Sequence, residues 1–171
     1  MACLRIRALP ILPTIIHHGT VKPDWVDYNG HMGDYAYTIV LSEAVDAFMD
    51  QVGLGAAHRH ATGCMLRVSE LRIAFLRELH EGDAFDVRLQ LIDRQAQSLR
   101  LFGQMIDAES GRDAALSDQL LIYASTAGNG IGRTHDFPEA VRLKLDQLRD
   151  DDRDEAPSTW LQSRIGIRRK T

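Results

Sequence analysis

This sequence has few cysteines, no excess of positive charge and no long apolar run. Its two cysteines, Cys3 and Cys64, give no spaced disulfide framework, so we expect reduced thiols in a cytoplasmic protein. No apolar run approaches the length of a membrane-spanning helix, and we therefore expect no membrane insertion. The formal net charge of −4 provides no general basic surface, which argues against nucleic-acid binding.

The chain is nevertheless long and apolar enough for one good hydrophobic core. Of its 171 residues 44% are hydrophobic and 26% are charged, as in ordinary soluble domains. Pro10 and Pro13 interrupt the first segment, so residues 1–14 are predicted to be a flexible lead-in rather than a signal peptide. We expect the folded domain to span residues 15–149. Residues 150–171 are predicted to form an acidic linker and a basic, partly apolar tail.

A strongly apolar helix is predicted over residues 34–52, with Gly53 as its C-terminal stop. Apolar side chains cover most of its surface and leave one narrow polar stripe, which consists of Asp34, Thr38, Ser42, Asp46 and Asp50. A helix with so wide an apolar surface has to be wrapped by another element.

The wrapping element is predicted to be an antiparallel sheet. Strand-like runs cover residues 15–22, 64–78, 84–93, 98–107 and 114–126, and short turn-forming segments separate the last four. Alternation along residues 71–75 and 85–91 gives these strands one apolar and one more polar face. Gly128, Gly130 and Gly132 then predict a loop, and a second helix is expected over about residues 136–149. The predicted fold class is α+β, and because one helix cannot close the sheet edges, we expect an edge-to-edge dimer.

The segment Val26-Asp27-Tyr28-Asn29-Gly30-His31-Met32-Gly33-Asp34 leads into the apolar helix. At a helix entrance the first four N–H groups lack intrahelical partners, and the helix dipole is positive. A carboxylate beside such donors is arranged to attack a polarised carbonyl, or to activate water against it. Taken alone, Asp27 fits a turn or capping role better, because aspartate is common in turns. The Asn29-Gly30 pair favours a tight turn with positive φ.

Two further patterns resemble ligand sites without meeting their requirements. His17-His18 and His58-Arg59-His60 lack the cysteine or carboxylate spacing of a zinc site, so no metal is predicted. The glycines that follow residue 126 do not precede a helix beginning with Lys and Ser or Thr, so a P-loop is not supported.

The stretch Trp25-Val26-Asp27-Tyr28-Asn29-Gly30-His31-Met32, with the helix after it, resembles the signature of hotdog-fold acyl-CoA thioesterases of the 4-hydroxybenzoyl-CoA thioesterase-like group. The stretch Glu70-Leu71-Arg72-Ile73-Ala74-Phe75-Leu76-Arg77-Glu78-Leu79, followed by Gly82-Asp83, is similar to that family's second strand and turn. Phe137-Pro138 and Ser163-Arg164-Ile165-Gly166-Ile167 are most similar to the branch of carnitine and betaine breakdown, whose activity is betainyl-CoA thioesterase.

This resemblance covers residues 17–145 and the tail, and it implies the hotdog fold, a long central helix wrapped by a curved antiparallel sheet. It also implies a homodimer or a dimer of dimers with active sites at the subunit interface. It assigns Asp27 as the nucleophile or general base, with Asn29 and His31 as further catalytic residues. The backbone amides of Gly33 and Asp34 would form the oxyanion site, where one good donor is worth about 3–4 kcal/mol.

One position departs from the family pattern. Where the family has Asn after His-Met, this chain has Gly33, which removes a side-chain amide but keeps the backbone donors. Glu43, on the central helix, is a reserve carboxylate, because some hotdog enzymes carry their base on that helix.

Substrate contacts can be assigned in the same way. If the acyl group carries a quaternary ammonium, Glu70 would supply a charge, and Trp25, Tyr28 and Tyr35 would supply aromatic faces, although aromatic residues near a buried helix usually belong to the core. Arg164 and Arg168 in the basic tail would either bind the phosphates of coenzyme A or form a solvated basic end. The chemistry requires no metal or redox cofactor, and coenzyme A enters as part of the substrate.

The predicted function is hydrolysis of a small acyl-CoA, with betainyl-CoA as the leading substrate, to the free acid and CoA. Two alternatives stay open. One is a non-catalytic hotdog module that binds an acyl thioester or serves as a scaffold, which the Gly33 departure keeps open. The other is a hotdog dehydratase or hydratase, although the spacing of Asp27 and His31 does not resemble the usual dehydratase pattern.

Overall fold

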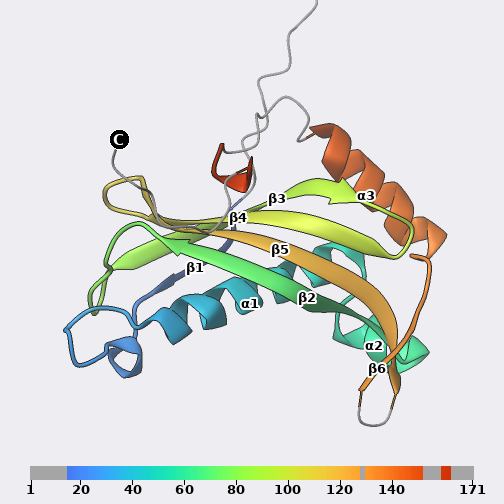
Figure 1. The fold of residues 1–171 in the computed structure, drawn as a ribbon, viewed down its shortest axis with the longest axis horizontal. Coiled ribbons are helices and arrows are strands. Elements are labelled where there is room, and N and C mark those ends of the chain that lie inside the picture. Colours follow the sequence, from blue (N-terminus) through green and yellow to red (C-terminus); the bar gives the residue numbers. More distant parts are fainter. Residues whose placement is uncertain (1–14, 128–129, 152–158, 163–171) are drawn as a thin grey trace, which may run out of the picture.

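In the computed structural model, which describes residues 15–127, 130–151 and 159–162, a curved antiparallel sheet wraps one long helix (Figure 1). The strands are β1 (Ile15–Thr20), β2 (Cys64–Phe75), β3 (Ala84–Arg94), β4 (Ser98–Asp107), β5 (Arg112–Ala127) and β6 (Gly130–Thr134). Their order is β1-β3-β4-β5-β2, and β6 pairs with the last residues of β5. The predicted α+β class and the wrapped central helix are confirmed.

The central helix α1 spans Asp34–Val52, as predicted. Its C-terminal cap is Gly53, whose φ of +86° lies in the left-handed region, and the Leu54 N–H closes the end by donating to Met49 O at 2.8 Å. The face buried against the sheet consists of Ala36, Tyr37, Val40, Leu41, Ala44, Val45, Phe48 and Val52. Ile39, which the sequence pattern assigned to the apolar surface, is 40% exposed.

The sheet approaches α1 most closely at Gly103 in β4. A Cβ atom at this position would collide with Ser117 Oγ and would lie 3.1 Å from Leu89 Cδ2 and 3.5 Å from Leu41 Cδ2. Because glycine has no side chain, the sheet can close around the helix here.

The structure corrects the sequence prediction at two elements. A short helix, α2 (Ala56–Thr62), occupies a segment predicted as a polar connection, and His58 Nε2 anchors it to Tyr123 Oη at 2.7 Å. The predicted glycine loop contains strand β6, where a Cβ at Gly132 would collide with Ser125 O. That glycine therefore permits close strand pairing, a role that sequence alone does not distinguish from a loop signal.

The remaining helices lie around the sheet. The helix α3 spans Glu139–Asp151, slightly later than predicted, and its Leu145 belongs to the buried core. Two single turns of 3-10 helix are η1 (Pro23–Trp25) and η3 (Thr159–Gln162). No helix among the described residues is long and apolar enough to cross a membrane.

Part of the predicted tail packs on the outer sheet face, opposite α1 (Figure 1). The guanidinium of Arg72 in β2 lies 3.8 Å from the ring centre of Trp160 in η3, and its Nη2 donates to Trp160 O at 2.9 Å. Arg72 also lies 4.0 Å from Asp118 of β5. The outer face at β2 and β5 is thus covered by charged and aromatic side chains.

Candidate active site

The loop before α1 is a tight turn closed by a short two-stranded bridge between Val26 and Met32. The Asp27 N–H donates to His31 O at 3.0 Å, and the Gly30 N–H donates to Asp27 O at 3.0 Å. Gly30 adopts a φ of +85°, which confirms the predicted turn and explains why a glycine stands there.

The carboxylate of Asp27 is fixed by its own turn. Oδ1 accepts the backbone N–H of Asn29 at 2.7 Å, and Oδ2 accepts the Asn29 side-chain amide at 3.2 Å. Desolvation acts to raise the pKa of Asp27, but the Asn29 hydrogen bonds and the nearby His31 ring outweigh it, so the pKa lies below the ordinary value of 3.8. Asp27 is therefore an oriented, ionised carboxylate near neutral pH.

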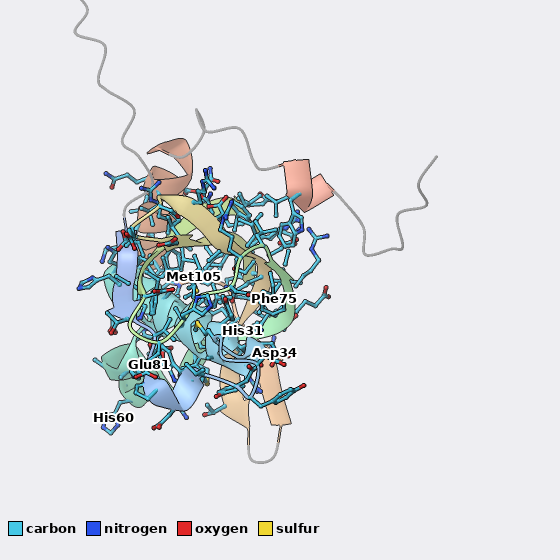
Figure 2. All side chains as sticks on the ribbon, turned by 90° about the vertical axis from the view of Figure 1, so that its left-hand side faces the viewer. His31, Asp34, His60, Phe75, Glu81 and Met105 are labelled. Carbon is cyan, nitrogen blue, oxygen red and sulfur yellow. The ribbon has the colours of Figure 1, made fainter. Side chains whose placement is uncertain are left out.

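This carboxylate lines an open groove of about 620 Å³ at the N-terminal end of α1. The groove is formed by Asp27, Tyr28, His31, Met32, Asp34, Tyr37, Phe75, Leu76, Arg77 and Glu78. Figure 2 shows His31, Asp34 and Phe75 gathered on one side of the molecule, with His60 at a distance from them. The groove thus joins the motif loop to the end of β2.

The helix entrance supplies fewer free donors than the sequence predicted. The Gly33 N–H donates to Trp25 O at 2.8 Å, and the Met32 N–H donates to Leu79 O at 2.7 Å. The Tyr35 N–H contacts Asp34 Oδ1 at 2.8 Å. Of the two predicted oxyanion donors, Gly33 is therefore occupied. The Asp34 N–H has no acceptor within the described part of the chain.

The ring of Tyr35 fills the space beside Gly33. A Cβ at Gly33 would lie 2.6 Å from Tyr35 Cε1, and the Tyr35 hydroxyl donates to Asp24 O at 2.7 Å. An asparagine at position 33, as in the family pattern, would therefore require the Tyr35 ring to move. The Tyr35 ring can take this position because position 33 has no side chain.

Other groove side chains support the loop and the end of β2. His31 Nδ1 lies 3.4 Å from Met32 O, and Nε2 lies 3.8 Å from Glu78 Oε1. The Tyr37 hydroxyl donates to Arg77 O at 3.1 Å, and burial raises the pKa of Tyr37. The Tyr37 ring meets Phe75 edge to face, with ring centres 5.2 Å apart.

The structure does not assemble the predicted aromatic and acidic substrate set within one chain. Trp25 is only 8% exposed and packs against Phe85, so it belongs to the core. Glu70 lies on the outer sheet face, two residues before Arg72, whereas Phe75 lies on the inner face against Tyr37. Tyr28 lines the groove and is 97% exposed.

The other predicted residues lie away from the groove or cannot be placed. Glu43, the reserve carboxylate, lies 3.2 Å from His17 Nε2 and joins α1 to β1. Arg164 and Arg168 lie outside the described residues. Sequence reasoning missed Phe75, Leu76, Arg77 and Glu78 as groove residues. The adjacent apolar pair Phe75-Leu76, which breaks the alternation of β2, was the available signal.

The thioesterase-like superfamily matches residues 21–145 of the chain. The chain belongs to this family. It is 37% identical to a betainyl-CoA thioesterase of Pseudomonas aeruginosa over 128 residues, which cover 75% of this chain and 79% of the relative.

Two further relatives add to this result. An L-carnitine dehydrogenase/betainyl-CoA thioesterase of Agrobacterium fabrum is 34% identical over 80% of this chain, although the match spans only 27% of that longer protein. A Staphylococcus aureus protein solved in complex with CoA superposes with a TM-score of 0.81 at 26% identity, covering 89% of this chain and 94% of that chain. The fold is the hotdog fold, and the protein is a thioester hydrolase acting on acyl-CoA.

Proposed function

We propose that this protein is a cytoplasmic enzyme that hydrolyses betainyl-CoA, or a closely related small acyl-CoA, with Asp27 as the catalytic carboxylate. The observation that carries the proposal is the groove in which Asp27, oriented by two hydrogen bonds from Asn29, lies at the entrance of α1. The names of the relatives from Pseudomonas aeruginosa and Agrobacterium fabrum support betainyl as the acyl group.

In the proposed reaction, the Asp27 carboxylate attacks the thioester carbon or takes a proton from a water that attacks it. The carbonyl oxygen becomes an oxyanion, which the Asp34 N–H at the positive end of α1 would stabilise. The C–S bond then breaks, and the thiolate of coenzyme A leaves. In the water route, the proton held by Asp27 passes to the thiolate after it leaves. In the carboxylate route, water afterwards cleaves the acyl–aspartyl anhydride and restores Asp27. Thiolate is a good leaving group, so no strong general acid is needed.

We further propose that two copies pair through the free edge of β2. This strand has twelve residues, and among the residues that the structure describes it pairs on one side only, with β5. Apolar side chains along this edge are unusually exposed, with Val68 at 42%, Leu71 at 39% and Phe75 at 52%. A long apolar strand edge of this kind requires a cover, and a second copy related by a two-fold axis supplies one without leaving an open edge.

The test is replacement of Asp27 by asparagine, which keeps the side-chain shape and removes the negative charge. We expect Asp27→Asn to lower kcat for thiol release from betainyl-CoA by about two to four orders of magnitude with an unchanged circular dichroism spectrum. Asp24→Asn, in the same loop and exposed, is the matched control and should retain activity. Activity of Asp27→Asn close to that of the control would contradict the proposal.

A further inference from the structure

A second and larger cavity, of about 750 Å³, lies at the other end of α1. Its walls come from the last turns of α1, from α2 and from the first residues of β2, and they include Asp46, Met49, Leu54, Arg59 and Met65. The reaction described above uses none of these residues within one chain.

Two carboxylates line this cavity, and they differ in their surroundings. Asp50 packs against Gly55, where any added Cβ would collide with its Oδ1, so its position is set by the turn into α2. Asp46 lies one turn earlier on the same helix face, and both residues are exposed. Within the described part of the chain, neither carboxylate accepts a hydrogen bond or forms an ion pair.

The groove and the cavity lie at opposite ends of the same edge. The groove is bounded by the start of α1 and the end of β2, and the cavity is bounded by the end of α1 and the start of β2. The two elements therefore run antiparallel beside each other, as Figure 1 shows. When two copies of β2 pair about a two-fold axis, the start of one strand lies beside the end of the other.

We infer that the partner subunit's Asp46 completes the active site and selects acyl groups that carry a quaternary ammonium. This inference rests on the proposed function, because it assigns the acyl-binding residue of the same site. If the two β2 edges pair about their middle, Met65 of one copy would lie next to Phe75 and Leu76 of the other, and each cavity would open onto the groove that contains Asp27 of the other subunit.

The lining of the cavity carries two carboxylates, Asp46 and Asp50, against the single guanidinium of Arg59, and this charge balance suits such a cation. A quaternary ammonium has no N–H donor, so it cannot use hydrogen bonds and is held by a nearby negative charge and by polarisable or aromatic surfaces. Asp46 supplies the charge, Met49 and Met65 supply polarisable surface, and Tyr28 from the groove side supplies an exposed ring. Asp46 thereby takes the role that the sequence assigned to Glu70, which lies on the outer sheet face.

The test compares two thioesters of the same shape, betainyl-CoA and tert-butylacetyl-CoA, in which an uncharged carbon replaces the nitrogen. We expect Asp46→Asn to lower kcat/KM for betainyl-CoA about tenfold or more and to leave kcat/KM for tert-butylacetyl-CoA unchanged. Glu70→Gln is the matched control and should change neither value. An unchanged value with betainyl-CoA, or an equal loss with both thioesters, would overturn the inference.

Mixed dimers test whether Asp46 acts in the partner's site. Differently tagged Asp27→Asn and Asp46→Asn chains are co-expressed, and the heterodimer is purified by both tags. If the site is shared, one of its two sites has both native carboxylates, and betainyl-CoA turnover should recover to about half of the wild-type value per dimer. Turnover no higher than that of the Asp46→Asn homodimer would place Asp46 in its own chain's site and overturn the inference.

The wild-type protein separates failure of this inference from failure of the proposed function. Hydrolysis of tert-butylacetyl-CoA but not of betainyl-CoA would overturn the inference and leave Asp27 as the proposed catalyst. Inactivity on both thioesters would end the proposed function itself.

Discussion

At the residue scale, Asp27 combines two roles that sequence analysis treated as alternatives. Its carboxylate closes a turn by accepting two hydrogen bonds from Asn29, and the same carboxylate lines the groove. The two roles are compatible because each carboxylate oxygen can accept more than one hydrogen bond. The turn therefore orients the group that we propose to be reactive, and it favours the ionised form.

This arrangement predicts a specific effect of Asn29 on titration. Because the folded-state pKa of Asp27 is depressed, Asp27 stays ionised as the pH falls from about 7 to 5, and the hydrogen bonds that stabilise it are lost only as the pH falls through that depressed value. Asn29→Ala removes the side-chain donor, so the pKa of Asp27 should rise towards 3.8. Carboxyl-carbon NMR titration measures this change. Tyr28→Ala is the control, and equal pKa values in both variants would contradict the prediction.

At the scale of elements, the close approach of β4 to α1 determines how tightly the sheet can curl. Gly103 lies beneath Leu41 of α1 and beside Ser117 of β5, and there is no room for another carbon atom. We expect Gly103→Ala to lower the free energy of unfolding by about 1–3 kcal/mol because it overpacks the core. Urea denaturation gives the measurement. Adding Ser117→Ala removes the oxygen with which the new Cβ collides and should restore part of the loss; no recovery in the double variant would show that the strain lies elsewhere.

At the scale of the whole molecule, the exposed apolar edge of β2 and the two cavities at its ends lead to one expectation. If two copies pair along β2, a charge in the middle of that edge should separate the two subunits. Activity should fall with dimerisation, because each active site would lose the wall that the partner subunit provides. We expect Leu71→Lys to behave as a monomer in light scattering with strongly reduced thioester hydrolysis. Leu143→Lys places the same charge on α3, where Leu143 is 58% exposed, and should leave both properties unchanged. A dimeric Leu71→Lys protein with full activity would rule out this edge.

The local pattern of residues was sufficient for most elements of the fold. The bounds of α1 follow from its apolar periodicity and from Gly53, and the alternation of Leu71, Ile73 and Phe75 correctly separated the two faces of β2. The same local signals misassigned Gly132, since a glycine that permits close strand pairing and a glycine in a loop look alike without the partner strand.

The residues that line the site could be identified only from the tertiary structure, because the site joins residues that lie far apart in the chain. The motif loop and α1 entrance were evident from sequence, but the other groove wall, Phe75 to Glu78, is brought there by the curl of the sheet. That curl also turns Glu70 away and leaves Trp25 in the core, which no pattern of neighbouring residues could show. Sequence alone determined that a carboxylate stands at the start of a wrapped helix. Tertiary structure decided which side chains face it, since facing residues are chosen by strand register and sheet curvature rather than by proximity along the chain.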